Sequence, residues 1–313
     1  MRMPIVLPAA AGRSFDAVGF GLNMTDLLVV LERFPQSDSK QPIRRRAYSP
    51  GGQAASAMVA CARLGWRTRY VGCFGDDENG RQGRSSLTDE GVDVSACRVA
   101  ADTPNGLSVI LVDERNGERT VLWSRDPGLR MGADDVDPAA VCAGRALVVD
   151  CHDAAASTAA ARHARRAGVR TLIDVERVRD GIEALLAEID VIITARDFPA
   201  ALTGESRPGA ALRAIRDAYR PALVCMTLGA EGSLALLGDV EVRTPAFRVP
   251  VVDTTGAGDV FRGGFIAGWL RAGDAAEVED LLRYANAVAA LKCRGLGARE
   301  ASPTPAEVDA LLG

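Results

Sequence analysis

Lysine is nearly absent from this chain of 313 residues, because only Lys40 and Lys292 stand among its 37 basic residues. The P-loop and the protein-kinase layout each bind phosphate with a lysine in a fixed sequence context. Neither lysine has such a context, so both layouts are excluded. The dinucleotide fingerprint fails as well, because Gly19 and Gly21 are followed by Met24 where a third small residue is required.

Paired cysteines and long apolar runs are also missing. The seven cysteines stand singly and there are two histidines, so neither a disulfide framework nor a zinc site is expected. No run approaches 18 apolar residues, and the first residues do not resemble a secretory signal, so we expect a cytoplasmic protein without a membrane partner. A net charge of −4 gives no electrostatic footprint for nucleic acid, and no such partner is expected.

What is present is an alternation of short apolar runs with longer amphipathic segments. This pattern is typical of β-α-β units. We therefore predict an α/β fold, with a mostly parallel central sheet and helices on both faces. The expected strands are 17–20, 68–73, 145–150, 171–175, 191–194 and 223–228, and the expected helices are 54–64, 154–167, 180–186, 209–218, 260–272, 278–291 and 305–312.

Two stretches, 31–48 and 106–124, break the alternation and are typical of added β structure. The second is a predicted hairpin with a turn at Asn116-Gly117. No helix is available to cover it, so one face must meet a substrate, the main domain or another subunit. We expect a small inserted β lid that closes over substrate, and an edge hairpin without a function is the alternative. The main domain would then comprise 1–30, 49–105 and 125–313. The alternating apolar positions of the hairpin are Val109, Leu111, Val121 and Trp123.

The run from Asp253 to Asp259 concentrates the most chemistry. Gly256, Ala257 and Gly258 are small and precede an apolar helix, so their backbone N–H groups can point at one anion near a helix N-terminus. Asp259 at the helix mouth is a poor phosphate ligand, and its expected role is to take a proton from an attacking hydroxyl. Strand ends at Asp150 and Asp174 are expected around the same crevice.

Four separated segments resemble the ribokinase-like, or PfkB-type, family of carbohydrate and nucleoside kinases. The resemblance extends over nearly the whole chain, and its most specific part is the run that ends at Asp259. The four segments are 21–26, 51–65, 227–232 and 253–264.

The resemblance implies transfer of the γ-phosphoryl group of ATP to a sugar-type hydroxyl, with Mg²⁺ accompanying ATP. Asp259 would be the base, and the amides of Gly256, Ala257 and Gly258 would form the anion hole. The substrate residues implied are Asn23, Asp26, Gly51, Gly52 and Ser56, and the nucleotide residues are Thr227, Gly229, Gly232 and Asn286.

The same resemblance implies a monovalent-cation site and a dimer. A bound K⁺ would be held by Asp253, the carbonyl of Thr255 and the segment 292–302, and would order the anion hole. The lid is expected to provide the contact of a homodimer.

The chain departs from the family pattern at two places. The segment 194–204 lacks the usual Asn-x-x-Glu, so Mg²⁺ is expected to be held mainly by ATP and water, with help from Asp197 or Glu176. Ser56 replaces a sugar-binding Asn of ribokinases, which disfavours ribose.

The approach to the catalytic run resembles the ketohexokinase and sulfofructose kinase branch, which favours a ketose or its derivative. A nucleoside kinase, a sugar-acid kinase and a catalytically silent sugar-binding regulator stay open as alternatives.

Overall fold

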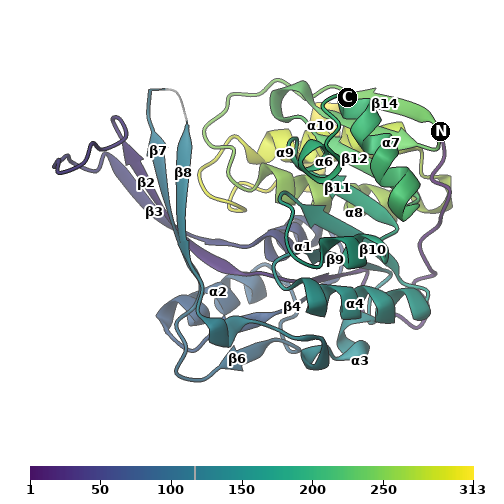
Figure 1. The fold of residues 1–313 in the computed structure, drawn as a ribbon, viewed down its shortest axis with the longest axis horizontal. Helices are drawn as coiled ribbons and strands as arrows, with labels where there is room; N and C mark the ends of the chain where they lie inside the picture. Colours follow the sequence, from purple (N-terminus) through teal and green to yellow (C-terminus); the bar gives the residue numbers. More distant parts are fainter. Residues whose placement is uncertain (116–117) are drawn as a thin grey trace.

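The computed structural model describes residues 1–115 and 118–313, and its centre is a twisted sheet (Figure 1). The strands of this sheet are β1 (Ala17–Phe20), β4 (Thr68–Val71), β9 (Ala146–Asp150), β10 (Arg170–Val175), β11 (Val191–Thr194), β12 (Leu223–Thr227), β13 (Ser233–Leu237) and β14 (Val240–Thr244). Their order is β14-β13-β12-β11-β10-β9-β1-β4. All neighbours pair in parallel except β12 with β13 and β13 with β14, so the predicted mostly parallel sheet is confirmed.

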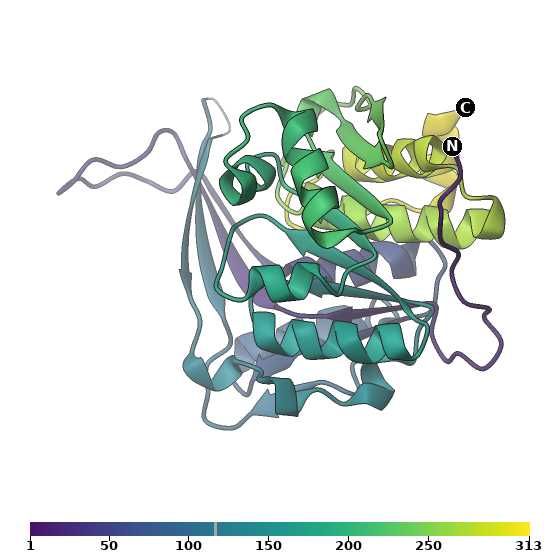
Figure 2. The same cartoon turned by 45° about the vertical axis from the view of Figure 1, so that its right-hand side comes forward.

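Helices cover both faces of this sheet. The helices are α1 (Gln53–Arg63), α2 (Glu78–Thr88), α3 (Pro138–Val141), α4 (Ala154–Arg166), α5 (Ile182–Leu186), α6 (Phe198–Thr203), α7 (Pro208–Tyr219), α8 (Ala257–Ala272), α9 (Val278–Lys292) and α10 (Pro305–Leu312). Along β9, Val148 packs into a core with α1, α8 and α9, and Val149 packs into a second core with α4, α5 and α7. The helices on the two sides of the sheet can be followed in Figures 1 and 2. Strands buried on both faces explain the continuous apolar runs in the sequence. Among the described residues no helix is long and apolar enough to cross a membrane.

A second sheet stands beside the main body, at the left of Figure 1. Its strands are β2 (Met24–Leu31), β3 (Arg45–Gly51), β7 (Leu107–Asp113) and β8 (Arg119–Ser124), in the order β3-β2-β7-β8. The two stretches predicted as added β structure therefore belong to one sheet, joined through β2. The sheet extends further than predicted, because β2 starts at Met24 and β3 ends at Gly51, inside the ranges 1–30 and 49–105 assigned to the main domain. The predicted Asn116-Gly117 turn lies outside the described residues.

Several elements were not predicted. Helix α2 was missed because its sequence is polar and buries only Gly80, Gly83 and Leu87, so it has no apolar stripe. The hairpin of β13 and β14 extends the main sheet beyond the last predicted strand. The predicted strand 68–73 is divided at Gly72 into β4 and β5 (Cys73–Gly75), and β5 pairs with β6 (Arg98–Ala100) in a separate small sheet.

Candidate active site

The run from Asp253 to Asp259, here called the catalytic run after its predicted role, forms a tight turn at the start of α8. Gly256 is the N-cap residue and has φ 73°, and a Cβ there would lie 2.2 Å from the carbonyl oxygen of Ala298. Only glycine fits such a position. The turn brings Ala257 and Gly258 to the first helical positions and Asp259 into the first turn of the helix. Anions are favoured at this end of a helix. The amide of Ala257 donates to the carbonyl of Thr254 at 3.2 Å, so the role of these amides as an anion hole stays a prediction.

Asp259 lies close to a second carboxylate, that of Asp174 at the end of β10, so the protonation of each side chain depends on the other. Burial and the charge of Asp174 raise the pKa of Asp259 well above its usual 3.8, and the guanidinium of Arg262 opposes this shift. Burial also raises the pKa of Asp174, to about 6. Asp150 pairs with Asp174 in register on the adjacent strand, so the expected gathering of these strand ends around the catalytic run is observed.

Arg262 was not predicted as a site residue, although it belongs to the catalytic helix. Its Nη2 forms an ion pair with Oδ1 of Asp174 at 2.9 Å, and each side chain is 3% exposed. The same nitrogen donates to the carbonyl of Ile193 at 3.2 Å. The sequence does contain a signal for this role, because Arg262 is a charged residue inside the apolar run that follows Asp259. A charged side chain at such a position is buried only when it is paired.

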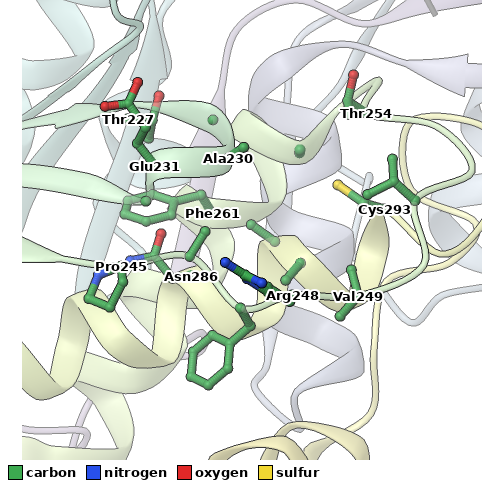
Figure 3. A pocket seen from close by; sticks show the side chains of 18 of the residues that line it. Thr227, Ala230, Glu231, Pro245, Arg248, Val249, Thr254, Phe261, Asn286 and Cys293 are labelled. Carbon is green, nitrogen blue, oxygen red and sulfur yellow. The ribbon is translucent and has the colours of Figure 1, made fainter.

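A pocket of about 1010 Å³ opens next to the anion-hole residues Ala257 and Gly258. All four predicted nucleotide residues line it: Thr227, Gly229, Gly232 and Asn286. Figure 3 shows Thr227 and Thr254 on opposite sides of this pocket, with Asn286 below them. The amide of Asn286 donates to the hydroxyl of Ser233 at 3.0 Å, which fixes its orientation. A cavity of this size is large enough for a nucleotide.

The predicted substrate residues lie at the base of the small sheet. Asp26 is 8% exposed and faces Gly51, where a Cβ would lie 2.2 Å from its Oδ2. Burial raises the pKa of Asp26 to about 6, and a hydrogen bond from Ser108 opposes the shift. At Gly52 a Cβ would lie 2.3 Å from the carbonyl oxygen of Leu22, so the chain needs two glycines to approach β2 this closely.

The side chains of Asn23 and Ser56 are buried more deeply than their predicted role in substrate binding suggests. The amide of Asn23 donates to the carbonyl of Cys73 at 2.6 Å, and its Oδ1 has no partner among the described residues. Ser56 is fully buried in α1, and its hydroxyl likewise has no partner there. Their assignment to substrate stays a prediction.

The register of the small sheet separates two rows of side chains, because residues directly opposite each other point to the same face. One row is polar with a single aromatic end: Ser49, Asp26, Ser108 and Trp123. The adjacent row, on the opposite face, is apolar: Tyr48, Leu27, Val109 and Leu122. Arg119 lies on the same face of β8 as Trp123, and its Nη1 donates to the hydroxyl of Thr254 at 3.1 Å, so the polar row faces the catalytic turn.

This register corrects the set of apolar lid positions taken from the sequence. Val109 and Leu111 point away from the catalytic turn, whereas Val121 and Trp123 point toward it. Alternation along each strand was predicted correctly, but the pairing of the two strands decides which positions share a face. All of β8 is exposed, and Trp123 is 65% exposed.

The residues expected to hold K⁺ are arranged around Lys292. The Asp253 carboxylate accepts hydrogen bonds from the amide and hydroxyl of Thr255, at 2.9 Å and 2.8 Å, and from the amide of Gly297 at 2.9 Å. The Nζ of Lys292 donates to the carbonyl of Asp253 at 3.1 Å. Burial lowers the pKa of Lys292, and the charge of Asp253 opposes that shift. The ammonium of Lys292 already brings a positive charge to the backbone of Asp253, so a second cation at this residue fits poorly.

For Mg²⁺ the protein offers few ligands. The described residues contain no group of three or more His, Cys, Asp or Glu side chains that could hold a metal ion. Glu176 influences the pKa of both Asp174 and Asp259, so its carboxylate lies within electrostatic reach of the reacting centre. One such carboxylate is sufficient for an ion that is bound mostly by phosphate oxygens and water.

Comparison with known proteins identifies relatives of this arrangement. Residues 15–305 match the sequence model of a protein family, the pfkB family of carbohydrate kinases. An ATP-dependent ribose-1-phosphate kinase of Halopiger xanaduensis is 32% identical over 290 residues, which cover 92% of this chain and 94% of that protein. A 2-dehydro-3-deoxygluconokinase of Thermoproteus tenax is 31% identical over 87% of this chain and 88% of its own length.

Solved structures agree with these relatives. A putative ribokinase from Agrobacterium tumefaciens has a TM-score of 0.87 and 25% identity, and the match covers 96% of this chain and 98% of that one. The fold is therefore ribokinase-like. Together with the family match over most of the chain, this similarity shows that the protein belongs to the pfkB family of carbohydrate kinases, phosphotransferases that use a hydroxyl group as acceptor.

Proposed function

We propose that this protein transfers the γ-phosphoryl group of ATP to a hydroxyl of a small carbohydrate, with a ketose or ketose derivative as the first candidate. The observation that carries the proposal is the position of Asp259. It follows the anion-hole residues at the edge of the nucleotide pocket, and it is within electrostatic reach of Asp26 on the small sheet. A hydroxyl held by Asp26 would therefore approach the base and the phosphate from the side opposite the nucleotide.

In this mechanism the protein mainly positions the reactants and stabilises charge. The amides of Gly256, Ala257 and Gly258 would hold negative charge that develops on the transferred group. Asp259 would accept the proton of the attacking hydroxyl, and the raised pKa of this carboxyl suits it to hold that proton. The guanidinium of Arg262 compensates the negative charge of Asp174, so that Asp259 can ionise beside this second carboxylate.

Mg²⁺ would be held by the phosphates of ATP, with Glu176 as the nearest candidate ligand from the protein. When bound, the ion supplies positive charge that offsets the charge of the phosphate oxygens. Asp197, the other candidate, is the N-cap residue of α6.

The small sheet is the proposed lid. Its polar row offers hydroxyl and carboxylate groups that can bind sugar hydroxyls, and Trp123 offers a flat apolar face next to them. The bond from Arg119 to Thr254 supports closure toward the catalytic turn. Closure would exclude water, which competes with the sugar for the phosphoryl group.

A homodimer through the lid is also proposed. The outward row contains Tyr48 and Leu122, which are 62% and 54% exposed. An uncovered apolar row across four strands is a favourable surface for a second copy of the same sheet.

The acceptor can be identified directly. Relatives of this chain have names that point to different substrate classes, because a fructokinase of Klebsiella pneumoniae is similar to it as well as the ribose-1-phosphate kinase and the 2-dehydro-3-deoxygluconokinase. A panel of ketoses, aldoses, sugar phosphates, sugar acids and nucleosides is incubated with ATP and Mg²⁺, and both ADP and the phosphorylated product are measured. We expect product from at least one carbohydrate, and a rate lower by about 10² to 10⁴-fold from the Asp259→Asn variant.

A catalytically silent regulator would behave differently in the same panel. It would bind a sugar in calorimetry without release of ADP. The presence of Asp259 beside the anion hole favours the kinase. Saturable sugar binding with no product from any member of the panel would reject the proposed activity.

A further inference from the structure

Lys292 is the last residue of α9, and its side chain is completely buried. A buried ammonium is costly unless oxygen atoms replace the water that it loses. Its Nζ donates to the carbonyl of Asp253, in the turn that leads to the anion hole. The other lysine, Lys40, is exposed. In a chain whose basic residues are otherwise arginines, the one buried lysine is therefore directed at the catalytic turn.

The side chain of Asp253 is already satisfied by neighbouring donors. Its two carboxylate oxygens accept three hydrogen bonds, two from Thr255 and one from Gly297. A potassium ion ligated by this carboxylate would share its oxygens with these donors and would be repelled by the ammonium of Lys292, whose charge interacts with that of Asp253. Positive charge is supplied instead by the ammonium on the carbonyl of the same residue.

An ammonium group and K⁺ seek the same partners, which are backbone carbonyls and carboxylates. Lysine is suited to this task because its charge is a compact point on a flexible stem, whereas the planar fork of arginine is not. We infer that the ammonium of Lys292 is the resident monovalent cation of this site and takes the place of K⁺ behind the anion hole. The inference rests on the proposed function.

The contacts show how Lys292 would act on the anion hole as a positioning residue. The carbonyl of Cys293 accepts from the amides of Val252 and Asp253, at 2.8 Å and 3.2 Å. Together with the Lys292 bond, these contacts attach the end of α9 to the segment before the catalytic turn. Gly256 in turn packs against the backbone of Ala298. A fixed carbonyl at Asp253 would therefore hold the turn in the orientation in which its amides meet phosphate.

The first test uses the unmodified protein. Its kinase rate is measured in K⁺, in Na⁺ and in a bulky organic cation at equal ionic strength. We expect the same rate in all three salts. Stimulation of the unmodified protein by K⁺ would overturn the inference.

The second test removes the charge. Lys292→Met keeps the length and the apolar stem, and a displaced turn should lower kcat by about 10²-fold in every salt. Lys292→Ala opens space, and its rate should fall similarly and recover in K⁺ or ammonium. Arg166→Met, which removes an exposed charge at the end of α4, is the control and should behave as the unmodified protein. A Lys292→Met variant with unchanged kcat would refute the role of the ammonium.

Melting temperature in the same salts gives a readout that does not need a substrate. K⁺ should raise the melting temperature of Lys292→Ala relative to the organic cation and leave that of the unmodified protein unchanged. A rise in the unmodified protein would count against the inference even if no substrate were phosphorylated. Failure of the proposed function and failure of the inference are thus distinguishable.

Discussion

Asp26 should make the protein less stable while it makes substrate binding possible. Its pKa is raised from 3.8 to about 6, because burial disfavours the carboxylate more than Ser108 and Arg299 favour it. The folded state therefore binds the proton more tightly than the unfolded state does. At neutral pH the ionised carboxylate costs about 3 kcal/mol of folding free energy, since each pKa unit corresponds to about 1.4 kcal/mol.

The Asp26→Asn variant should remove this cost, because the amide has nearly the same shape and no charge. For a chain of this length we expect the melting temperature to rise by about 5 °C at neutral pH. The cost is absent below the unfolded pKa of 3.8, grows as the pH rises toward about 6 and is complete above it, so the gain should follow the same window.

Calorimetry across this pH range measures the gain, and KM for the sugar is measured in parallel. The variant should bind sugar more weakly, because a carboxylate is the stronger acceptor for hydroxyl groups. Asp16→Asn is a matched control: Asp16 is also buried but forms an ion pair with Arg67, so its loss should not stabilise the protein. An Asp26→Asn melting temperature equal to or below that of the unmodified protein at neutral pH would refute the reasoning.

Three further changes test the site. Asp259→Asn should lower kcat by about 10² to 10⁴-fold with ATP binding preserved in calorimetry, and a rate above half of normal would remove Asp259 from the mechanism. Arg262→Met should shift the acidic limb of the rate profile to higher pH, because Arg262 lowers the pKa of Asp259; Arg262→Lys should restore part of it, and an unmoved limb would contradict this role. Trp123→Ala should raise KM for the sugar but not for ATP, whereas Leu122→Ser on the other face should weaken self-association in sedimentation and leave KM unchanged; identical effects of the two changes would contradict the assignment of faces.

The helix start at 256–259 and the fold class could be predicted because their signals are local in the sequence, whereas the catalytic role of this run stays a prediction. Gly256 to Asp259 are contiguous, and a glycine-lined helix start has the same chemistry wherever the fold places it. The buried strands of the main sheet are recognisable as uninterrupted apolar runs for a similar reason. Sequence alone was sufficient for these elements.

The rest depends on contacts between segments that are far apart in the chain. Lys292 meets Asp253 across 39 residues, and no local pattern specifies where a flexible side chain ends. The role of Trp123 depends on the register of β8 against β7, and a shift of one residue would turn it outward. Helix α2 lacks the apolar stripe by which a helix is recognised in a sequence. It packs closely through Gly80 and Gly83 instead of through larger apolar side chains.

The course of β2 has a consequence for fidelity. The strand carries Asp26 near its first residue and continues to Leu31 along the small sheet, a lever of about 17 Å at 3.3 Å per residue. A compound that binds to Asp26 would therefore contact the first residues of β2, whose remaining residues belong to the proposed lid. In the proposed mechanism recognition and closure would be one event. A poor acceptor would then be discriminated against twice, because it would bind weakly and would also fail to bring about the closure that transfer requires.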